Sequence, residues 1–567
     1  MNTRSFWWLA MAFTLLWIWM EWNQFQQAKS LPAPQEQTTQ IASQPTGSTV
    51  PMANQAVTPN NDGSVPSASL GAEIPAAKVS ALQDQRISVV TDVFDIVIDT
   101  QGGDIRDVRL LKYAANEDHS LPFQLMGDTG KRMYIAQNGI AMQPNSPLTA
   151  PTHNSIYQTS QTNYTMSGDT LSVPLTWQKD GVKITKTYHF KKGDYLINVD
   201  YKIENTTNVD WAGSLYSQLK RNTYDPEHNA MMYTYTGSVL YDGHAESKYI
   251  KHAFDDLDTS PVNSQQTTGG WAAMIQHYFL AAVVPNQTTV NTLYAKPAGN
   301  AGEYVAGIVE PLANVKAGTT DTISTSLYIG PIIQDRLEEI APGLELTVDY
   351  GVLTIIAEPI FWLLGIIYSF VGNWGWSIIV LTILIKLAFY KLSETSYRSM
   401  ARLKKFQPKL KQLKENYGDD KMVYQKKMMD MYKEEKINPL GGCLPILVQM
   451  PVFIALYWVL LYSAEMRQAP WMLWIQDLSA TDPYYILPVI MGISMWVQQK
   501  LNPSAMMDEM QQKVMKFLPI IFTVFFMFFP AGLVLYWVVN NILSVSQQWY
   551  ITKKIEAGED TKEKKKK

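Results

Sequence analysis

A single lysine stands where a membrane would make its charge costly. Lys386 lies within the apolar run 383–389. On insertion scales, a lysine at the centre of a membrane helix costs about 2.5–3.5 kcal/mol. Its side chain either extends to the lipid headgroups from near the end of its helix, or its ammonium group faces a water-filled cavity between helices. The second arrangement would create a cationic site inside the membrane.

Other polar side chains in apolar segments favour the second arrangement. Thr382 precedes Lys386 by one helical turn and lies on the same helix face. The remaining members of this group are Gln449, Gln498, Gln499, Asn540 and Asn541. Each amide alone is typical of a helix–helix contact. Together they predict a hydrophilic interior that opens toward the inner side of the membrane.

The residue patterns of common catalytic and metal sites are missing from the sequence. Residues 127–131 resemble a phosphate-binding loop only in part, because Leu125 stands where that motif requires glycine. The seven histidines have no metal-ligand spacing, and neither a Gly-x-Ser-x-Gly nor a His-Glu-x-x-His motif occurs. The one cysteine, Cys443, excludes an internal disulfide. We therefore expect no enzyme, no cofactor and no bound metal.

The first 84 residues predict an anchor followed by a linker. The apolar run 6–20 is rich in tryptophan and is not followed closely by a small-x-small cleavage site. We interpret residues 1–28 as an uncleaved membrane anchor with its N-terminus in the cytoplasm. Residues 29–84 are rich in Gln, Pro, Ser and Thr, which indicates a flexible linker.

Residues 85–345 predict a large β domain. Residues 195–204 alternate apolar and polar side chains with the period of a strand that has one buried face. A turn at 191–194 joins this strand to 182–190 as a hairpin. Further strands are expected at 93–98, 171–177, 279–285 and 322–329. Pro174 restricts its strand to a sheet edge. At about this size we expect one β-sandwich.

Apolar segments dominate the remainder of the chain. They cover residues 352–371, 374–392, 440–463, 484–500 and 516–550. The last is too long for one span, and the Pro-Ala-Gly sequence at 530–532 predicts a reversal within it.

The distribution of lysines indicates which of these segments cross the membrane. The loop 391–436 and the tail 564–567 are rich in lysine, which predicts that both are cytoplasmic. Only one of the first two segments can then span, so we interpret 346–372 as a helix on the outer membrane surface. The expected architecture is a bundle of about six membrane helices with both termini cytoplasmic. The spans are 6–22, 374–392, 440–463, 484–500, 514–529 and 533–550.

The basic loop predicts a helical hairpin at 396–437. The first helix carries an apolar seam at Leu403, Phe406, Leu410 and Leu413. The second helix carries a matching apolar seam at Tyr424, Met428 and Met431. The first helix should end at 417–418, and Asp419 or Asp420 should cap the second. Candidate contact residues are Lys404, Lys405, Lys409, Lys426 and Lys427. The hairpin is either a self-paired coiled coil with solvated lysines or a docking surface for phosphate-rich partners such as ribosomal RNA.

Five sequence stretches together resemble the YidC/Oxa/Alb family of membrane protein insertases. They are 343–351 (GLELTVDYG), 438–445 (NPLGGCLP), 449–453 (QMPVF), 478–488 (LSATDPYYILP) and 529–537 (FPAGLVLYW). The resemblance covers nearly the whole chain except the linker, and it indicates the bacterial form with a large periplasmic domain.

This resemblance implies a fold, a location and partners. The β domain would be a periplasmic supersandwich similar to sugar mutarotases. The core, 373–552, would be five helices around a groove open to the cytoplasm and to lipid, followed by a basic cytoplasmic tail at 553–567. The protein would insert and help to fold membrane proteins of the bacterial inner membrane. Its partners would be nascent membrane proteins, Sec translocon components, the ribosome and targeting machinery, and membrane lipids.

The resemblance also implies roles for individual residues. Lys386 matches the position of the groove charge, where the family usually has arginine, so a bidentate contact with a carboxylate is lost. Trp537 and Gln498 match positions that line the groove, and Thr382 and Gln449 are weaker candidates.

Two other classes of function stay open from the residues alone. A small-solute transporter with Lys386 as counter-ion would require two similar halves with broken helices, and the sequence contains no internal repeat. A membrane-anchored enzyme acting on sugars would require a paired acid and base in the β domain. Its only local candidates are Glu227-His228 and His244-Ala245-Glu246.

Overall fold

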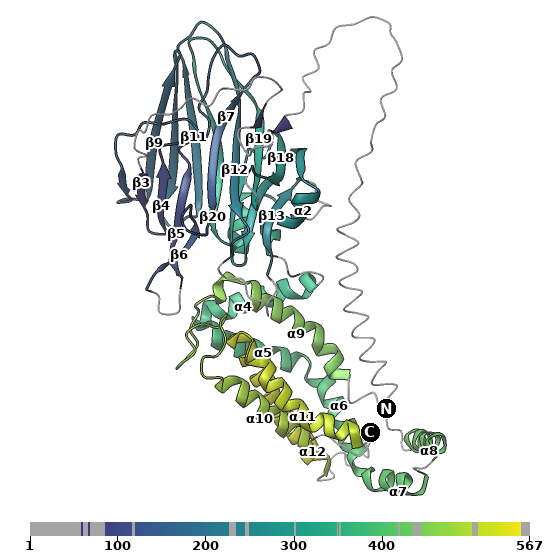
Figure 1. The fold of residues 1–567 in the computed structure, drawn as a ribbon. Coiled ribbons are helices and arrows are strands. Elements are labelled where there is room, and N and C mark those ends of the chain that lie inside the picture. Colours follow the sequence, from purple (N-terminus) through teal and green to yellow (C-terminus); the bar gives the residue numbers. More distant parts are fainter. Residues whose placement is uncertain are drawn as a thin grey trace, which may run out of the picture.

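The computed structural model divides the chain into a β domain and a helical part (Figure 1). It describes residues 58–59, 66–67, 86–115, 120–225, 234–243, 249–299, 302–348, 350, 353–417, 420–434, 444–501 and 509–556. The predicted anchor 1–28, nearly all of the linker 29–84 and most of the basic tail lie outside the described residues. The same holds for Glu227-His228 and His244-Ala245-Glu246.

One sheet of the β domain has eight strands in the order β14-β13-β16-β17-β20-β11-β10-β9. In that order the strands are Ile250–His252, Thr236–Tyr241, Trp271–Gln276, Phe279–Val284, Thr320–Pro331, Leu196–Asn205, Val182–Lys191 and Thr170–Lys179. β9, which contains Pro174, lies at the edge of this sheet, as predicted. The predicted hairpin is confirmed, since β10 and β11 pair antiparallel with His189 opposite Asn198.

The second sheet follows the order β15-β18-β19-β12-β7-β5-β4-β3-β8, and β6 also pairs with β5. These strands are Val262–Thr268, Val290–Pro297, Glu303–Val315, Trp211–Asn222, Tyr134–Met142, Ile105–Ala114, Phe94–Asp99, Arg86–Val90 and Asn163–Thr165, with β6 at Pro122–Met126. A two-residue pair, β1 (Thr58–Pro59) and β2 (Pro66–Ser67), stands apart from both sheets.

The two sheets share one hydrophobic core. Along β11, Ile197, Val199, Tyr201 and Ile203 are buried, which confirms the predicted alternation. Trp211 of one sheet and Trp271 of the other are among the largest fully buried side chains. This apolar burial is what stabilises two large sheets against each other.

The helical part contains nine longer described helices and lies against one end of the β domain (Figure 1). They are α4 Thr354–Val371, α5 Trp374–Ala388, α6 Tyr390–Lys405, α7 Gln407–Tyr417, α8 Lys421–Glu434, α9 Leu444–Tyr462, α10 Ile486–Leu501, α11 Glu509–Phe526 and α12 Ala531–Glu556. Short helices are α2 Phe254–Thr259, α3 Gln334–Ile340, η1 Leu344–Thr347 and η4 Ala464–Met466.

The prediction of one continuous helix over 374–392 is wrong. α5 ends at Ala388, and the chain turns by 66° into α6. The Asn373 side chain caps the start of α5 by accepting a hydrogen bond from the Trp376 amide at 3.1 Å. Neither proline nor glycine marks the break, so its cause lies in packing: α6 lies along the C-terminal part of α12, where Tyr397, Ala401, Ile551 and Ile555 form a small core.

The predicted reversal near Pro530 is confirmed. α11 ends at Phe526 and α12 begins at Ala531. The loop before α10 holds this turn, because the amides of Ala531 and Gly532 donate to the carbonyl oxygens of Ala480 (2.7 Å) and Leu478 (2.9 Å).

Helix length alone identifies few candidate spans among the described residues. α4 is the only described helix that is by itself long and apolar enough to cross a membrane. α5 and the first part of α6 would make a second if the bent pair acts as one span, and α9 and α11 contain shorter apolar stretches.

The predicted pair of helices in the basic loop is observed with one change. The first predicted helix is broken at Phe406, between α6 and α7. α7 ends at Tyr417, and the Asp420 carboxylate caps α8 by accepting from the amides of Met422 (3.0 Å) and Val423 (3.1 Å). α7 and α8 pack around Leu410 and Tyr432, with Met428 and Met431 beside them. Tyr432 was not in the predicted seam.

Candidate functional site

Three helices of the helical part converge on the Lys386 side chain. Its Nζ donates hydrogen bonds to Ser544 Oγ on α12 at 2.7 Å and to Gln449 Oε1 on α9 at 3.4 Å. No carboxylate of the described residues pairs with this ammonium group. An ammonium group has three N–H donors, and these two acceptors leave one for another partner.

A chain of polar contacts extends from this lysine along α12. Gln449 Nε2 donates to Asn540 Oδ1, and Ser544 Oγ donates to the Asn540 carbonyl oxygen at 2.7 Å. Asn540 and Ser544 are both buried, and so is Gln548 one turn further on. These three residues recur every four positions, so they form one polar stripe on α12. On the neighbouring face, Asn541 Nδ2 donates to Ser494 Oγ of α10 at 3.2 Å.

The structure brings together only some of the predicted groove residues. Gln449 contacts Lys386 directly, whereas the buried Thr382 hydroxyl donates to the Ile378 carbonyl oxygen of its own helix at 2.6 Å. Trp537 packs edge-on against Phe453 at 4.8 Å between ring centroids. Gln498 is half-buried and makes no hydrogen bond to any described residue.

Ser544 is the contact that the sequence analysis missed. A serine in an apolar helix is a weak signal, since its hydroxyl can bond to its own backbone. The signal was its position one turn after Asn540, on the face that faces Lys386.

Two family models cover nearly all of the described chain. Residues 86–363 match the YidC periplasmic domain, and residues 366–559 match the 60Kd inner membrane protein family. A membrane protein insertase YidC from Thioalkalivibrio sulfidiphilus is 46% identical over 568 residues, covering 98% of this chain and 99% of the relative. The chain belongs to the YidC family of membrane protein insertases.

A second relative agrees with this assignment. The YidC insertase of Stutzerimonas stutzeri is 47% identical over 564 residues and also covers 98% of this chain. A crystal structure of an active YidC insertase with its first transmembrane domain resolved is 17% identical, with a TM-score of 0.39, and covers 83% of this chain and 93% of that one. The protein is thus a membrane protein insertase, and the relatives give no support to the solute-transporter alternative.

The candidate contact lysines of this YidC family member lie on α6, α7 and α8 and are not among the hydrogen-bond partners of the Lys386 cluster. Lys409 on α7 and Lys426 and Lys427 on α8 are exposed. Lys404 and Lys405 fall at the end of α6, and their side chains lie outside the described part of the chain. α7 and α8 stand at the end of the helical part opposite the β domain (Figure 1).

Proposed function

We propose that this insertase works through a hydrophilic groove around Lys386, lined by α5, α9 and α12 and open to the cytoplasm and to lipid. The observation that carries the proposal is the Lys386 ammonium group, which bonds to Ser544 and Gln449 and has no described carboxylate partner. A cation held by neutral acceptors keeps its charge available to an acidic group that enters the groove.

The energetics of insertion explain why such a groove is useful. A polar tail that crosses hydrocarbon loses several kcal/mol for each unpaired polar group. A groove that admits water part of the way shortens the dry path, and Lys386 attracts acidic residues of the tail. The apolar helix of the substrate then leaves sideways along α9 and α11. Several large apolar side chains of α11 are exposed and suit such an exit, among them Phe517, Ile520 and Ile521.

The proposed topology places the β domain in the periplasm, as a supersandwich over 85–345, and the hairpin 396–437 in the cytoplasm. The lysine-rich hairpin and the β domain stand at opposite ends of the helical part (Figure 1), which supports this assignment. Five helices then form the membrane core, α5, α9, α10, α11 and α12, and the anchor 6–22 supplies the sixth span. α4 rests on the outer surface, since only residues 372 and 373 separate it from α5.

The proposed partners follow from the surface of the hairpin. The exposed Lys409, Lys426 and Lys427 suit the phosphates of ribosomal RNA or an acidic face of the targeting machinery. Nascent membrane proteins would enter from there, either directly or from the Sec translocon.

The groove is tested by variants of Lys386 in a cell-free insertion assay with substrates whose outer tails carry acidic residues. We expect Lys386→Ala to lower insertion severalfold, Lys386→Glu to lower it further, and Lys386→Arg to retain it, because only the last keeps the cation. Lys391→Ala is the matched control, since Lys391 is exposed on α6 just beyond the bend.

Full insertion by both Lys386→Ala and Lys386→Glu would exclude the attraction step. A substrate with a neutral tail distinguishes the water-filled path from the attraction by Lys386. Such a substrate needs the water-filled path but not the charge.

A further inference from the structure

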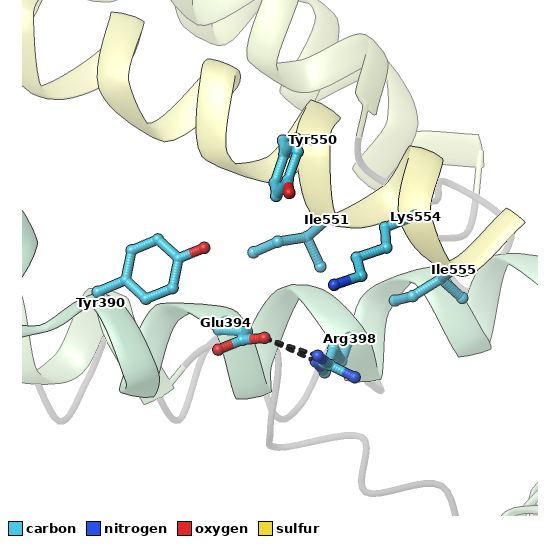
Figure 2. A pocket seen from close by; sticks show the side chains of 7 residues that line it. All are labelled: Tyr390, Glu394, Arg398, Tyr550, Ile551, Lys554 and Ile555. Atoms are coloured by element: carbon cyan, nitrogen blue, oxygen red, sulfur yellow. Dashed lines mark hydrogen bonds and ion pairs between the residues drawn. The ribbon is translucent and has the colours of Figure 1, made fainter. Parts of the chain in front are cut away.

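A small polar pocket lies between α6 and α12 (Figure 2), and its lining includes neither Lys386 nor the two residues that accept from it. Its cavity measures about 120 Å³. The lining residues are Tyr390, Glu394, Arg398, Tyr550, Ile551, Lys554 and Ile555. Because one water occupies about 30 Å³ of liquid, this space is sufficient for a phosphate group.

The pocket carries a net positive charge. The Arg398 guanidinium donates to Glu394 Oε1 from Nε (3.1 Å) and from Nη2 (2.7 Å), one turn away on α6. Lys554 extends from α12 into the same space (Figure 2) and makes no ion pair with any described residue. The lining thus contains two cations, Arg398 and Lys554, and one carboxylate, Glu394. An anion in the pocket would offset the excess positive charge.

A larger apolar groove adjoins this pocket. It measures about 440 Å³ and is lined by Val497 and Leu501 of α10 and by Val545, Ser546, Trp549 and Tyr550 of α12. Tyr550 lines both cavities, so the polar pocket and the apolar groove lie next to each other at this side chain. Tyr550 and Trp549 are both more than half exposed, as is typical of aromatic residues at a membrane–water interface.

The order of the two cavities along α12 matches the shape of a lipid. The groove is built on residues 545–550 and the pocket on residues 550–555. A rise of 1.5 Å per residue places their centres roughly 8 Å apart along the helix. In the proposed topology the C-terminal end of α12 faces the cytoplasm, so the groove lies deeper in the membrane than the pocket.

We propose that these cavities bind one anionic phospholipid of the cytoplasmic leaflet, with its phosphate between Lys554 and Arg398 and an acyl chain in the groove. This inference rests on the proposed topology. The acyl chain has apolar surroundings in the bilayer and in the groove alike, so the groove fixes its position and the charge contact provides the preference for an anionic headgroup.

The test uses the full-length chain in vesicles of phosphatidylethanolamine that contain a minor fraction of phosphatidylglycerol with a photoactivatable acyl chain. We expect crosslinks on residues 497–501 and 545–550 to exceed those on the exposed apolar face of α11. Each basic side chain near an anionic headgroup contributes about 1 kcal/mol, which equals about a fivefold change in binding. Lys554→Gln should therefore lower the crosslinks about fivefold.

Lys553→Gln is the matched control for this variant. Lys553 is the preceding residue, is exposed, and its Nζ lies over the Trp549 ring at 5.1 Å from the centroid. Equal losses from both variants would indicate general attraction to the membrane surface and overturn the proposal. Ser546→Trp should fill the groove and displace the probe, and unchanged crosslinks would also overturn it.

Two further experiments test whether the bound anion is a lipid headgroup and whether the proposed topology is correct. Inorganic phosphate should not displace the probe, and displacement by phosphate would identify a soluble-anion site in place of a lipid site. In a Cys443→Ala background, Lys554→Cys should react with an impermeant maleimide only in inverted vesicles. Reaction from the outside would overturn the topology and this inference with it. Lys386→Ala should keep the crosslinks, so a failure of the groove is distinguishable from a failure of the lipid site.

Discussion

Ser544 connects the Lys386 ammonium group to the backbone of α12. It accepts from Lys386 Nζ at 2.7 Å and donates to the Asn540 carbonyl oxygen. A hydrogen bond to a charged group contributes about 1.5–3 kcal/mol. We expect Ser544→Ala to release the lysine side chain and to lower insertion of substrates with acidic tails about tenfold.

Ser546 supplies the control for that variant, since its hydroxyl also donates to the backbone one turn before, at Ile542, but lies on the exposed face of α12. If Ser546→Ala impairs insertion as much as Ser544→Ala does, the loss reflects helix stability and the assigned role of Ser544 is wrong.

The β domain contains a lysine with no exposed surface. Lys186 is fully buried and donates to the carbonyl oxygens of Gly102 (3.1 Å) and Gly103 (2.8 Å). Burial lowers the pKa of Lys186, and the nearby Asp104 carboxylate opposes that shift. The side chain therefore ties β10 to the turn before β5.

Replacement of this lysine should destabilise the β domain. Lys186→Met leaves the buried Gly102 carbonyl oxygen without its donor and removes a cation near Asp104, which we expect to cost about 3 kcal/mol. The Gly103 carbonyl oxygen keeps the Tyr188 hydroxyl as a donor. Hydrogen exchange of the β10 amides measures the loss. Lys183→Met on the same strand removes only a partly exposed ion pair with Glu204 and should change the stability by less than about 1 kcal/mol. Equal effects would contradict a special role for Lys186.

Among single residues, the sequence indicated Lys386 and Gln449 because a polar side chain in an apolar run is unusual. Ser544 escaped notice because serine is common in helices, and only the packing of α12 against α5 and α9 gives it a partner. Thr382 was predicted from its helix face, yet a hydroxyl that bonds to its own backbone needs no partner in a groove.

At the scale of elements, the length of α4 and the distribution of lysines indicate different positions for this helix in the membrane. It is long and apolar enough to cross a membrane, whereas the distribution of lysines predicts that it lies on the outer surface. Ala357 and Leu364 are buried, while Ile355 and Phe370 near its two ends are highly exposed.

The position of α4 is measurable with single cysteines in a Cys443→Ala background. We expect Ile355→Cys and Phe370→Cys to react with impermeant reagents from the periplasmic side only, because both ends of a surface helix share one side of the membrane. Reaction of the two positions from opposite sides would make α4 a span and would reverse the proposed orientation of α5.

The bend between α5 and α6 belongs to the same scale. The apolar run through residue 392 predicted a longer helix, since no helix-breaking residue interrupts it. Contacts between α6 and α12 end α5 at Ala388 instead. Reversals marked by Pro-Ala-Gly were predictable, because their signal is local.

At the scale of the whole molecule, the loop between α9 and α10 holds the β domain against the helices. Ala114 exchanges hydrogen bonds with the Gln468 side chain at 3.0 and 2.8 Å, and its carbonyl oxygen also accepts from Arg467 Nη1 at 2.8 Å. The Arg467 guanidinium lies over the Phe123 ring at 4.9 Å from the centroid. His277 Nε2 contacts the Leu461 carbonyl oxygen at 3.1 Å.

This interface should weaken in acid. The pKa of His277 is lowered from 6.5 to about 4 in the docked form. Burial is the largest cause and Arg467 acts in the same direction, whereas the Leu461 carbonyl and Asp225 oppose the shift. An undocked His277 would titrate near 6.5, so the undocked form binds more protons between about pH 4 and 6.5. The contribution of His277 to the free energy of docking is therefore fully present above about pH 6.5. It is lost progressively as the pH falls toward 4, and the total loss is about 1–3 kcal/mol.

The Ala114 amide reports on this change, because it donates to Gln468 only in the docked form. We expect its protection from hydrogen exchange, corrected for intrinsic rate, to fall over that pH window, and His277→Ala to remove the pH dependence. His189→Ala is the control, since His189 pairs with Asp200 on an exposed face. A pH dependence that survives in His277→Ala would assign it to another group.

The sequence by itself determined the parts of this protein whose signals are local. Strand alternation, the edge position of β9, the cap at Asp420, the reversal at Pro530 and the position of Lys386 in an apolar segment all depend on neighbours within a few residues. The tertiary structure decided what depends on contacts between distant segments: the end of α5, the partners of Lys386 and the docking of the β domain. The lipid pocket belongs to this second group, because its cations come from helices more than 150 positions apart in the chain, and only packing of α6 against α12 brings them together.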